Sequence, residues 1–331
     1  MTTAIPATTT MQAVTREEYG SADVVRVGQV PRPVPGSGEV LLRVHAAGLD
    51  RGVWHVMTGM PYAGRLVFGL TRPKDPVLGL DVSGTVVALG AGVTAFSEGD
   101  EVYGFGQGTF AQYAVASVAK LSRKPSNLSF EQAAAVPVSA STALQALDAG
   151  RVEQGQSVLV IGASGGVGLY AVQLATALGA RVTGVCSTAK MDLVRSAGAE
   201  HVIDYSGEDF ADGRARYDLV LDIAGNPGVR RLRRALTPTG TAVIIGGEDG
   251  GSWTGSMDRQ FRALALSLFV RQRLTMVIAK QRASDLERLT ALIESGAVTP
   301  SVERTYPLEQ AADAIRQLVT GGVRGKVVVV P

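Results

Sequence analysis

From residue 157 to about residue 245, short apolar runs alternate with longer amphipathic segments, and this rhythm limits the possible folds more than any other feature of the sequence. The apolar runs have the length of strands, and the segments between them have the periodicity of helices. Strands that are apolar throughout are buried on both faces, and the helices that join them cover those faces. We therefore predict an α/β fold with a doubly wound parallel sheet in this part of the chain.

Glycines mark the ends of the first two predicted helices, because Gly179 and Gly198 follow them directly. The predicted strands are residues 158–161, 182–186, 201–203, 219–223 and 242–245. The predicted helices are residues 167–178, 189–197 and 229–236. This order of elements is the Rossmann pattern.

The segments before and after this region have a different pattern. Residues 11–16, 40–46, 82–89, 102–105 and 110–115 are predicted strands, separated by Gly, Pro and Asp, which indicates an irregular and mostly antiparallel β domain. Ser129 with Gln132 three residues later predicts a capping box at the start of a helix. After an apolar segment at 274–279, we expect helices at 284–295 and 308–319. The final strand, 326–330, could extend the parallel sheet or return to the β domain.

Length and composition exclude several classes of protein. A chain of 331 residues suggests two domains. Its 32 basic and 30 acidic side chains leave a formal charge of +2, which gives no reason to expect nucleic acid or an anionic membrane as a partner. Cys186 is the only cysteine, so neither an intrachain disulfide nor a multi-cysteine zinc site can form. With no signal-peptide pattern at the N-terminus, we expect a soluble, cytoplasmic protein.

A loop rich in small residues joins the first predicted strand of the parallel sheet to the helix after it. The residues of this loop are Gly162, Ala163, Ser164, Gly165, Gly166, Val167 and Gly168. Small side chains let a backbone approach a pyrophosphate closely, and the amides at the helix N-terminus supply donors and a positive dipole end. A tight structural turn is the alternative. The strand before the loop and the helix after it favour dinucleotide binding.

The end of the second predicted strand indicates which dinucleotide is bound. An NAD site places Asp or Glu at this point to accept from a ribose hydroxyl, and none is present here. Ser187, Thr188 and Lys190 offer two hydroxyls and an ammonium instead, which suit a 2′-phosphate. NADPH is therefore the expected cofactor. In the alternative interpretation, Ser187 caps the next helix and Lys190 is simply solvated.

The ordered set of motifs resembles the medium-chain dehydrogenase/reductase superfamily, in its zinc-independent quinone oxidoreductase branch, over essentially the whole chain. The motifs are the loop at 162–168 and residues 76–84, 99–102 and 198–205. The resemblance implies a Rossmann domain, residues 129–280, inserted in a GroES-like β domain that comprises residues 1–128 and 281–331. It also implies that Lys190 and Tyr205 contact the 2′-phosphate and that Thr142 lies near the nicotinamide ribose. Gly246 completes the expected cofactor-binding set, and Arg324 and Lys326 are further candidates.

Two departures from the zinc-dependent members of the superfamily lead us to expect no metal. Those enzymes carry Gly-His-Glu where this chain has Gly79, Leu80 and Asp81, and their catalytic cysteine is replaced by the Leu49 and Asp50 pair. Without a Lewis acid, the chain has no evident means of stabilising an alkoxide. Hydride delivery to an activated double bond or a quinone needs no metal, because conjugation spreads the developing charge.

Three side chains are candidates for the catalytic chemistry. Asp50 and His55 stand where the family has Asn and Tyr beside the nicotinamide, and Tyr62 follows shortly after. Asp50 could hydrogen-bond the nicotinamide ribose or the substrate, and His55 could deliver a proton. In the alternative interpretation, His55 is a structural donor and water is the acid.

The sequence thus predicts an NADPH-dependent, metal-free reductase that transfers a hydride to a quinone or an α,β-unsaturated carbonyl compound. One alternative is a metal-free NADP-dependent alcohol dehydrogenase. The other is an NADPH-binding sensor or RNA-binding protein without turnover, although the arginines at 230–234 fit a solvated helix face better than an RNA groove. We expect a small-molecule substrate and a homodimer, with residues 264–270 and 274–279 as the contact region.

Overall fold

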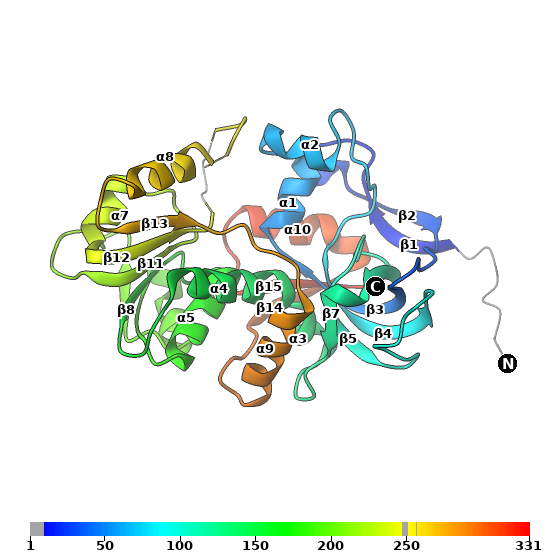
Figure 1. Ribbon diagram of the computed structural model, residues 1–331. Coiled ribbons are helices and arrows are strands. Elements are labelled where there is room, and N and C mark those ends of the chain that lie inside the picture. Colours follow the sequence, from blue (N-terminus) through cyan, green and yellow to red (C-terminus); the bar gives the residue numbers. More distant parts are fainter. Residues whose placement is uncertain (1–9, 247–250, 256) are drawn as a thin grey trace.

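The computed structural model describes residues 10–246, 251–255 and 257–331. Two halves lie side by side, a half with a parallel sheet on the left of Figure 1 and a β half on the right. No helix in these three stretches combines the length and the apolar character that crossing a membrane requires.

The parallel sheet has six strands in the order β10-β9-β8-β11-β12-β13. The strands are β8 (Ser157–Ile161), β9 (Arg181–Cys186), β10 (His201–Asp204), β11 (Tyr217–Asp222), β12 (Leu236–Ile244) and β13 (Arg273–Met276). The helices of this half are α4 (Pro137–Gly150), α5 (Gly166–Ala177), α6 (Met191–Ser196), α7 (Val229–Ala235), α8 (Met257–Ser267) and α9 (Ala283–Glu294). From β8 the chain adds β9 and then β10 on one side of the sheet, and from β11 it adds β12 and then β13 on the other side. The predicted doubly wound sheet is confirmed, and its switch point lies between β8 and β11.

The β half contains a second, mostly antiparallel sheet. Its order is β14-β15-β3-β4-β5-β7, with β6 also paired to β3. The strands are β3 (Glu39–Leu49), β4 (Asp81–Leu89), β5 (Glu101–Phe105), β6 (Tyr113–Ser117), β7 (Leu121–Arg123), β14 (Val302–Pro307) and β15 (Lys326–Val330). A separate hairpin of β1 (Thr10–Thr15) and β2 (Arg26–Pro31) lies at its edge. The final strand therefore returns to the β half, where it pairs with β14 and β3.

Four helices accompany the strands of the β half. They are α1 (Arg51–Thr58), α2 (Arg65–Phe68), α3 (Phe130–Ala134) and α10 (Ala311–Val319). The capping box at the start of α3 is confirmed, because Ser129 and Gln132 exchange both bonds. Several details differ from expectation. The strand expected at 110–115 begins only at Tyr113. The helices expected at 189–197 and 308–319 each open with a 3₁₀ turn, over Thr188–Lys190 and Leu308–Gln310.

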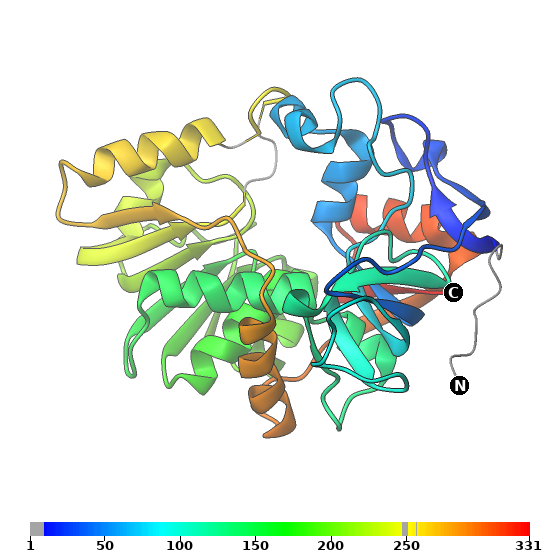
Figure 2. The same ribbon diagram turned by 45° about the vertical axis from the view of Figure 1, so that its right-hand side comes forward.

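Helix α9 lies at the bottom of the molecule between the two halves, as both Figure 1 and Figure 2 show in orange. Its Leu286, Leu289 and Ile293 are buried in the core that also holds α4 and α5. From the β half, the Tyr103 hydroxyl donates to the Leu286 carbonyl at 2.7 Å. Because α9 packs on both halves, the domain boundary near residue 280 stays a prediction.

Candidate functional site

A cavity of about 640 Å³ lies where the two halves meet, at the carboxyl end of the parallel sheet. The ends of β8, β9 and β11 line it through Ile161, Val185 and Ile223, so it opens at the switch point of the sheet. The β half contributes Asp50 and Lys326 to the opposite wall. Side chains from both halves, far apart in the sequence, therefore line the same cavity.

The glycine-rich loop forms one wall of this cavity. Gly162 has a φ of +84°, which favours glycine, and α5 begins at Gly166. A Cβ on Gly168 would lie 2.1 Å from the Gly162 carbonyl oxygen, so the first turn of the helix is pressed against the loop. The N-terminal amides of α5 have no partner within the helix, and together with the helix dipole they favour an anion there.

Of the seven predicted loop residues, five line the cavity and two do not. The lining residues are Gly162, Ser164, Gly165, Gly166 and Val167. Ala163 is fully buried, and Gly168 lies against the backbone of Ala163 and Gly162. These two residues let the loop pack closely, and they do not themselves face the space.

The predicted 2′-phosphate region lies at the end of β9. Ser187, Lys190 and Tyr205 line the cavity there. The ammonium of Lys190 donates to the carbonyl oxygens of Gly321 at 2.8 Å and Val323 at 2.7 Å, so it is bound to the loop before β15. The segment between α10 and β15 thus closes this end of the cavity.

Thr188 does not line the cavity, because its hydroxyl donates to the carboxylate of Asp204. Ser206 adds two hydrogen bonds to the same carboxylate, from its amide at 3.0 Å and its hydroxyl at 2.7 Å. The bond from Thr188, followed by those from Ser206, lowers the pKa of Asp204. An ionised carboxylate therefore lies beside the predicted phosphate region.

Thr142 and Gly246 also lie outside the cavity wall. The Thr142 hydroxyl donates to the Val138 carbonyl of its own helix at 2.6 Å. The Gly246 carbonyl accepts from Arg259 at 2.8 Å. Their proposed contacts with a cofactor stay predictions.

A buried ion pair ties together two loops that follow β11 and β12. The Arg259 guanidinium of α8 donates to the Asp222 carboxylate at 2.5 Å, to the Pro227 carbonyl at 2.8 Å and to the Gly246 carbonyl. Asp222 is fully buried, and this burial raises its pKa to about 7 although Arg259 acts in the opposite direction. The loop that this pair holds includes Pro227, which lines the cavity.

Arg231 and Phe210 are among the lining residues that the sequence analysis missed. Arg231 binds the Asp209 carboxylate at 2.8 Å, and its guanidinium lies 4.4 Å from the centre of the Phe210 ring. Both Arg231 and Phe210 line the cavity. The interpretation of residues 230–234 as a solvated face holds for Arg231, whose side chain is exposed, although it also lines the cavity. Its place at the start of the helix after β11, beside the switch point, was the available signal.

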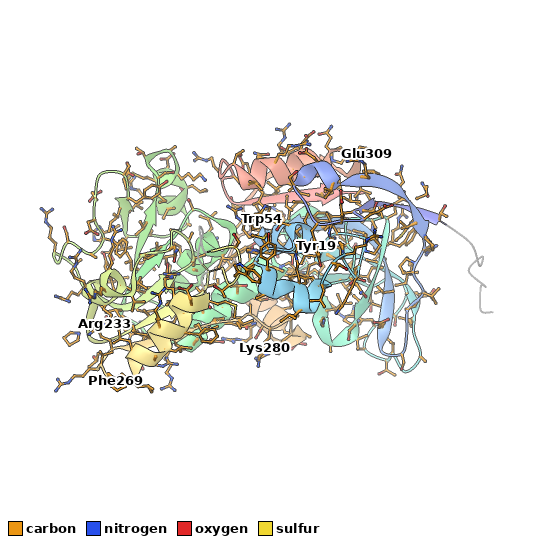
Figure 3. The ribbon with its side chains drawn as sticks, turned by 90° about the horizontal axis from the view of Figure 1, so that it is seen from above. Tyr19, Trp54, Arg233, Phe269, Lys280 and Glu309 are labelled. Carbon is orange, nitrogen blue, oxygen red and sulfur yellow. The ribbon has the colours of Figure 1, made fainter. Side chains whose placement is uncertain are left out.

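The three catalytic candidates do not converge. Asp50 lines the cavity, whereas His55 and Tyr62 do not. His55 Nδ1 lies 2.8 Å from the Met60 carbonyl, and because a carbonyl only accepts, Nδ1 carries the proton of that bond. The Tyr62 ring packs edge-on against Trp253, with 5.5 Å between ring centres. From above, Trp54, next to His55, lies near the centre of the molecule where the halves meet (Figure 3).

Asp50 belongs to a buried cluster of three charged side chains. It caps α1 through Oδ1, which accepts from the Gly52 amide at 2.6 Å, while its Oδ2 is buried without a hydrogen-bond partner. Asp81 on β4 is fully buried and accepts from the Val138 amide at 2.9 Å and from Lys326 at 3.4 Å. Lys326 on β15 is itself only 3 % exposed.

Comparison with known proteins identifies the family. A model of the alcohol dehydrogenase GroES-like domain matches residues 36–126, and one described as zinc-binding dehydrogenase matches residues 197–329. The chain is 32% identical over 339 residues to the chloroplast envelope quinone oxidoreductase homolog of Arabidopsis thaliana, covering 97% of this chain and 98% of that relative. A chloroplastic NADPH-dependent alkenal/one oxidoreductase of the same plant is 32% identical over 340 residues, or 97% of this chain and 80% of that relative. The structure of the quinone oxidoreductase from Coxiella burnetii matches with a TM-score of 0.87 and 29% identity, covering 98% and 100% of the two chains.

The chain belongs to the quinone oxidoreductase branch of the medium-chain dehydrogenase/reductase superfamily. The resemblance inferred from the sequence is confirmed, and so is the predicted combination of a GroES-like domain with a Rossmann sheet. Members of this branch are nicotinamide-dependent oxidoreductases, and this chain is an oxidoreductase.

The zinc that one matching family model names does not fit the residues of this chain. Across the described stretches of the sequence, no three His, Cys, Asp or Glu side chains come together as a metal site. In the cleft, the carboxylate of Asp81 already faces the ammonium of Lys326, and Leu80 offers no ligand atom. A divalent cation placed beside a buried ammonium would be repelled by it.

Proposed function

We propose that this quinone oxidoreductase relative is an NADPH-dependent, metal-free reductase that transfers a hydride to a quinone or to an activated double bond of an α,β-unsaturated carbonyl compound. One observation carries the proposal. A single cavity joins the glycine-rich loop to Asp50 and Lys326, so a bound dinucleotide and a polar group able to handle protons would share one space. The printed names of the quinone and alkenal/one oxidoreductase relatives support the same chemistry.

The residues of the cavity fit a dinucleotide. The loop at 162–168 and the N-terminus of α5 would hold the pyrophosphate, because they offer amides and no bulky side chain. Ser187, Lys190 and Tyr205 would face the 2′-phosphate, and Phe210 and Arg231 line the same end of the cavity. When bound, NADPH supplies the hydride. The chain contributes orientation of the two reactants, exclusion of water and control of the proton.

The side chains of the cleft favour conjugated substrates. Reduction of a quinone or an enone leaves its negative charge spread over a conjugated system, whereas a simple alkoxide needs a cation or a strong donor beside it. Lys326 is almost fully buried, and its ammonium pairs with the carboxylate of Asp81. The cleft therefore favours an acceptor that stabilises its own charge.

Steady-state oxidation of NADPH against a panel of quinones, enones and, in the reverse direction, alcohols with NADP tests the proposal. We expect turnover with quinones or enones, no comparable oxidation of alcohols, and unchanged rates after treatment with a chelator. Elemental analysis of the same preparation should find no stoichiometric zinc. Activity confined to alcohols, or lost together with a bound metal, would show that the assignment is wrong.

Cofactor choice can be tested at Lys190. Replacing Lys190 by alanine removes the ammonium at the predicted 2′-phosphate region, and we expect NADPH affinity to fall about 10- to 150-fold, which corresponds to about 1.5–3 kcal/mol for a hydrogen bond to a charged group. NADH has no 2′-phosphate, so its affinity should barely change. Fluorescence titration of both cofactors measures the difference. An equal loss for both would mean that Lys190 only fastens the loop at Gly321 and Val323.

We also propose that the chain forms a homodimer through the parallel-sheet half. Strand β13 is an edge strand of the six-stranded sheet, and Leu268 and Phe269 at the end of α8 are more than four-fifths exposed. Phe269 projects from the end of the molecule farthest from the β half (Figure 3). A second copy would cover both the strand edge and these side chains.

The lone, buried Cys186 is compatible with a reducing compartment, and on that ground we propose a cytoplasmic location.

A further inference from the structure

The Lys326 side chain extends from the β half to the glycine-rich loop of the other half. Lys326 begins β15, and the next residue, Val327, pairs with Leu49 of β3. A Cβ on Gly166, the first residue of α5, would lie 2.9 Å from the Cδ atom of Lys326. The lysine therefore lies against the helix N-terminus that would hold the pyrophosphate of the cofactor.

The Lys326 ammonium has more donors than partners. Lys326 is only 3 % exposed, and it lines the cavity. In the part of the chain that the structure describes, its ammonium makes one hydrogen bond, to Oδ2 of Asp81 at 3.4 Å, which is long for a bond between charged groups. An ammonium carries three N–H donors, so two are left over. A buried cation needs acceptors, and an anion bound in the cavity would supply them.

Asp81 is the partner of this ammonium, and it is fully buried on β4. Among the described residues, the charged or titratable groups that face it are Lys326 of β15, Asp50 at the start of α1 and Tyr170 of α5. The other elements packed around it contribute uncharged groups, which are Gly48 of β3, Phe105 of β5, Ala134 of α3 and the Val138 amide of α4. Of these groups, only Lys326 carries a positive charge.

The protonation of Asp81 depends on that positive charge. Burial raises the pKa of Asp81 to about 8, the ammonium of Lys326 opposes this rise, and the charge of Asp50 adds to it. An anion at Lys326 would bring further negative charge close to Asp81 and would occupy donors of the ammonium. Both effects raise the pKa of the carboxyl group further, by about one unit or more. Anion binding and proton binding are therefore linked.

We propose that Lys326 binds the pyrophosphate of the dinucleotide, and that this binding draws one proton from the solvent onto Asp81. The inference rests on the dinucleotide binding of the proposed function. Asp81 is a positioning residue, because it holds the ammonium beside the loop before the cofactor arrives. Once protonated, its carboxyl group no longer competes with the pyrophosphate for the positive charge of Lys326.

The direction of the pH effect follows from this linkage. Below about pH 7, Asp81 carries its proton with and without cofactor, so binding takes none up. Between about pH 8 and the higher pKa of Asp81 in the complex, only the complex holds the proton. Cofactor affinity should therefore fall as the pH rises through this interval. The pyrophosphate is common to NADPH and NADH, so the fall should be the same for both.

Isothermal titration calorimetry of the protein with NADPH and with NADH tests the linkage without any turnover. Titrations in buffers that differ in their enthalpy of ionisation count the protons taken up on binding. We expect almost no uptake at pH 7 and about half a proton or more at pH 9. Over the same interval, the affinity for either cofactor should fall about five- to tenfold.

The Asp81→Asn variant assigns the proton. Asparagine keeps an acceptor for the Val138 amide and resembles the protonated carboxyl group, so the fold should be retained. We expect proton uptake at pH 9 to fall below about 0.1, and affinity to vary less than about twofold between pH 7 and pH 9, because an amide does not titrate there. The matched control is Asp285→Asn on α9, another buried aspartate, which accepts from Gln145 at 2.8 Å and should behave as wild type.

The Lys326→Met variant tests the ammonium itself. We expect the affinities for NADPH and NADH to fall alike, by about 10- to 150-fold, the usual effect of losing a hydrogen bond to a charged group. Lys190→Ala, in contrast, should weaken NADPH alone. Thermal unfolding without cofactor shows whether Lys326→Met is folded. If it is not, the proton counts of the wild type and of Asp81→Asn still decide.

Several results would overturn the inference and leave the proposed function in place. They are NADPH binding without proton uptake at pH 9, an uptake that persists in Asp81→Asn, and unchanged affinity in a folded Lys326→Met. A merely structural Asp81 would change affinity by the same factor at every pH. If the wild-type protein bound neither NADPH nor NADH, the proposed function itself would have failed.

Discussion

Replacing Arg259 by methionine is expected to lower the free energy of unfolding by about 3–5 kcal/mol, because it leaves the fully buried carboxylate of Asp222 without its counter-charge. The loss should depend on pH. The pKa of Asp222 is raised by burial to about 7 even with Arg259 present, and it rises further without the guanidinium. An acid whose folded-state pKa exceeds its unfolded value loses stability as the pH rises between the two. The difference between wild type and variant should therefore widen above pH 7.

Chemical denaturation at pH 6 and pH 9 measures this effect. The matched control is Arg262→Met, one turn further along α8, where the guanidinium pairs with Asp258 on the surface. An exposed pair of this kind contributes about 0.5 kcal/mol or less. If the two variants lost the same stability, or if the Arg259 loss were constant with pH, the buried pair would not be what holds the loops after β11 and β12.

Gly168→Ala is expected to cost about 3 kcal/mol of stability, at the upper end of the usual range for overpacking. The added Cβ would lie 2.1 Å from the Gly162 carbonyl oxygen and 2.7 Å from the backbone of Ala163, and neither can move without displacing β8 or α5. The loop should shift away from the helix, so we also expect NADPH affinity to fall about 100-fold through the misplaced amides.

Gly165→Ala provides the control within the same loop. Its φ is −79°, and an added Cβ meets nothing nearer than the Gly162 oxygen at 3.6 Å, which is an ordinary contact. Thermal unfolding of the two variants without cofactor should separate them clearly, with Gly165→Ala close to wild type. Equal stability of both would mean that α5 is free to move away from the loop.

Features decided by nearby residues could be predicted from the sequence. The capping box of Ser129 and Gln132, the glycine-rich loop and the strands of the parallel sheet depend on short spacings and on apolar runs, and they were found where expected. Helix α1 was missed because Val53, Trp54 and Val56 are poor helix formers. It forms because Asp50 caps it and because its buried face packs on the β-half core.

Features decided by long-range contacts could not be predicted in this way. Asp81 and Lys326 are 245 positions apart, and only the pairing of β15 with β3 brings them together. The binding partners of the Lys190 ammonium could not be predicted from the sequence either. Its residue type suits a phosphate, but the folded chain also offers two carbonyls of a loop 131 and 133 residues away. A sequence motif indicates the chemistry of a side chain, but it does not determine which group in the folded protein that side chain binds.

The place of β15 between β14 and β3 has a consequence for the order in which this protein is built during synthesis. All six strands of the parallel sheet have been made once residue 276 is reached, so that half can assemble while the chain is still growing. The β half begins first, yet its sheet keeps a gap until residues 326–330 arrive. Those residues also carry Lys326 to Asp81. The dinucleotide half can therefore form before the catalytic cleft, which is completed only when the five residues of β15 have been made.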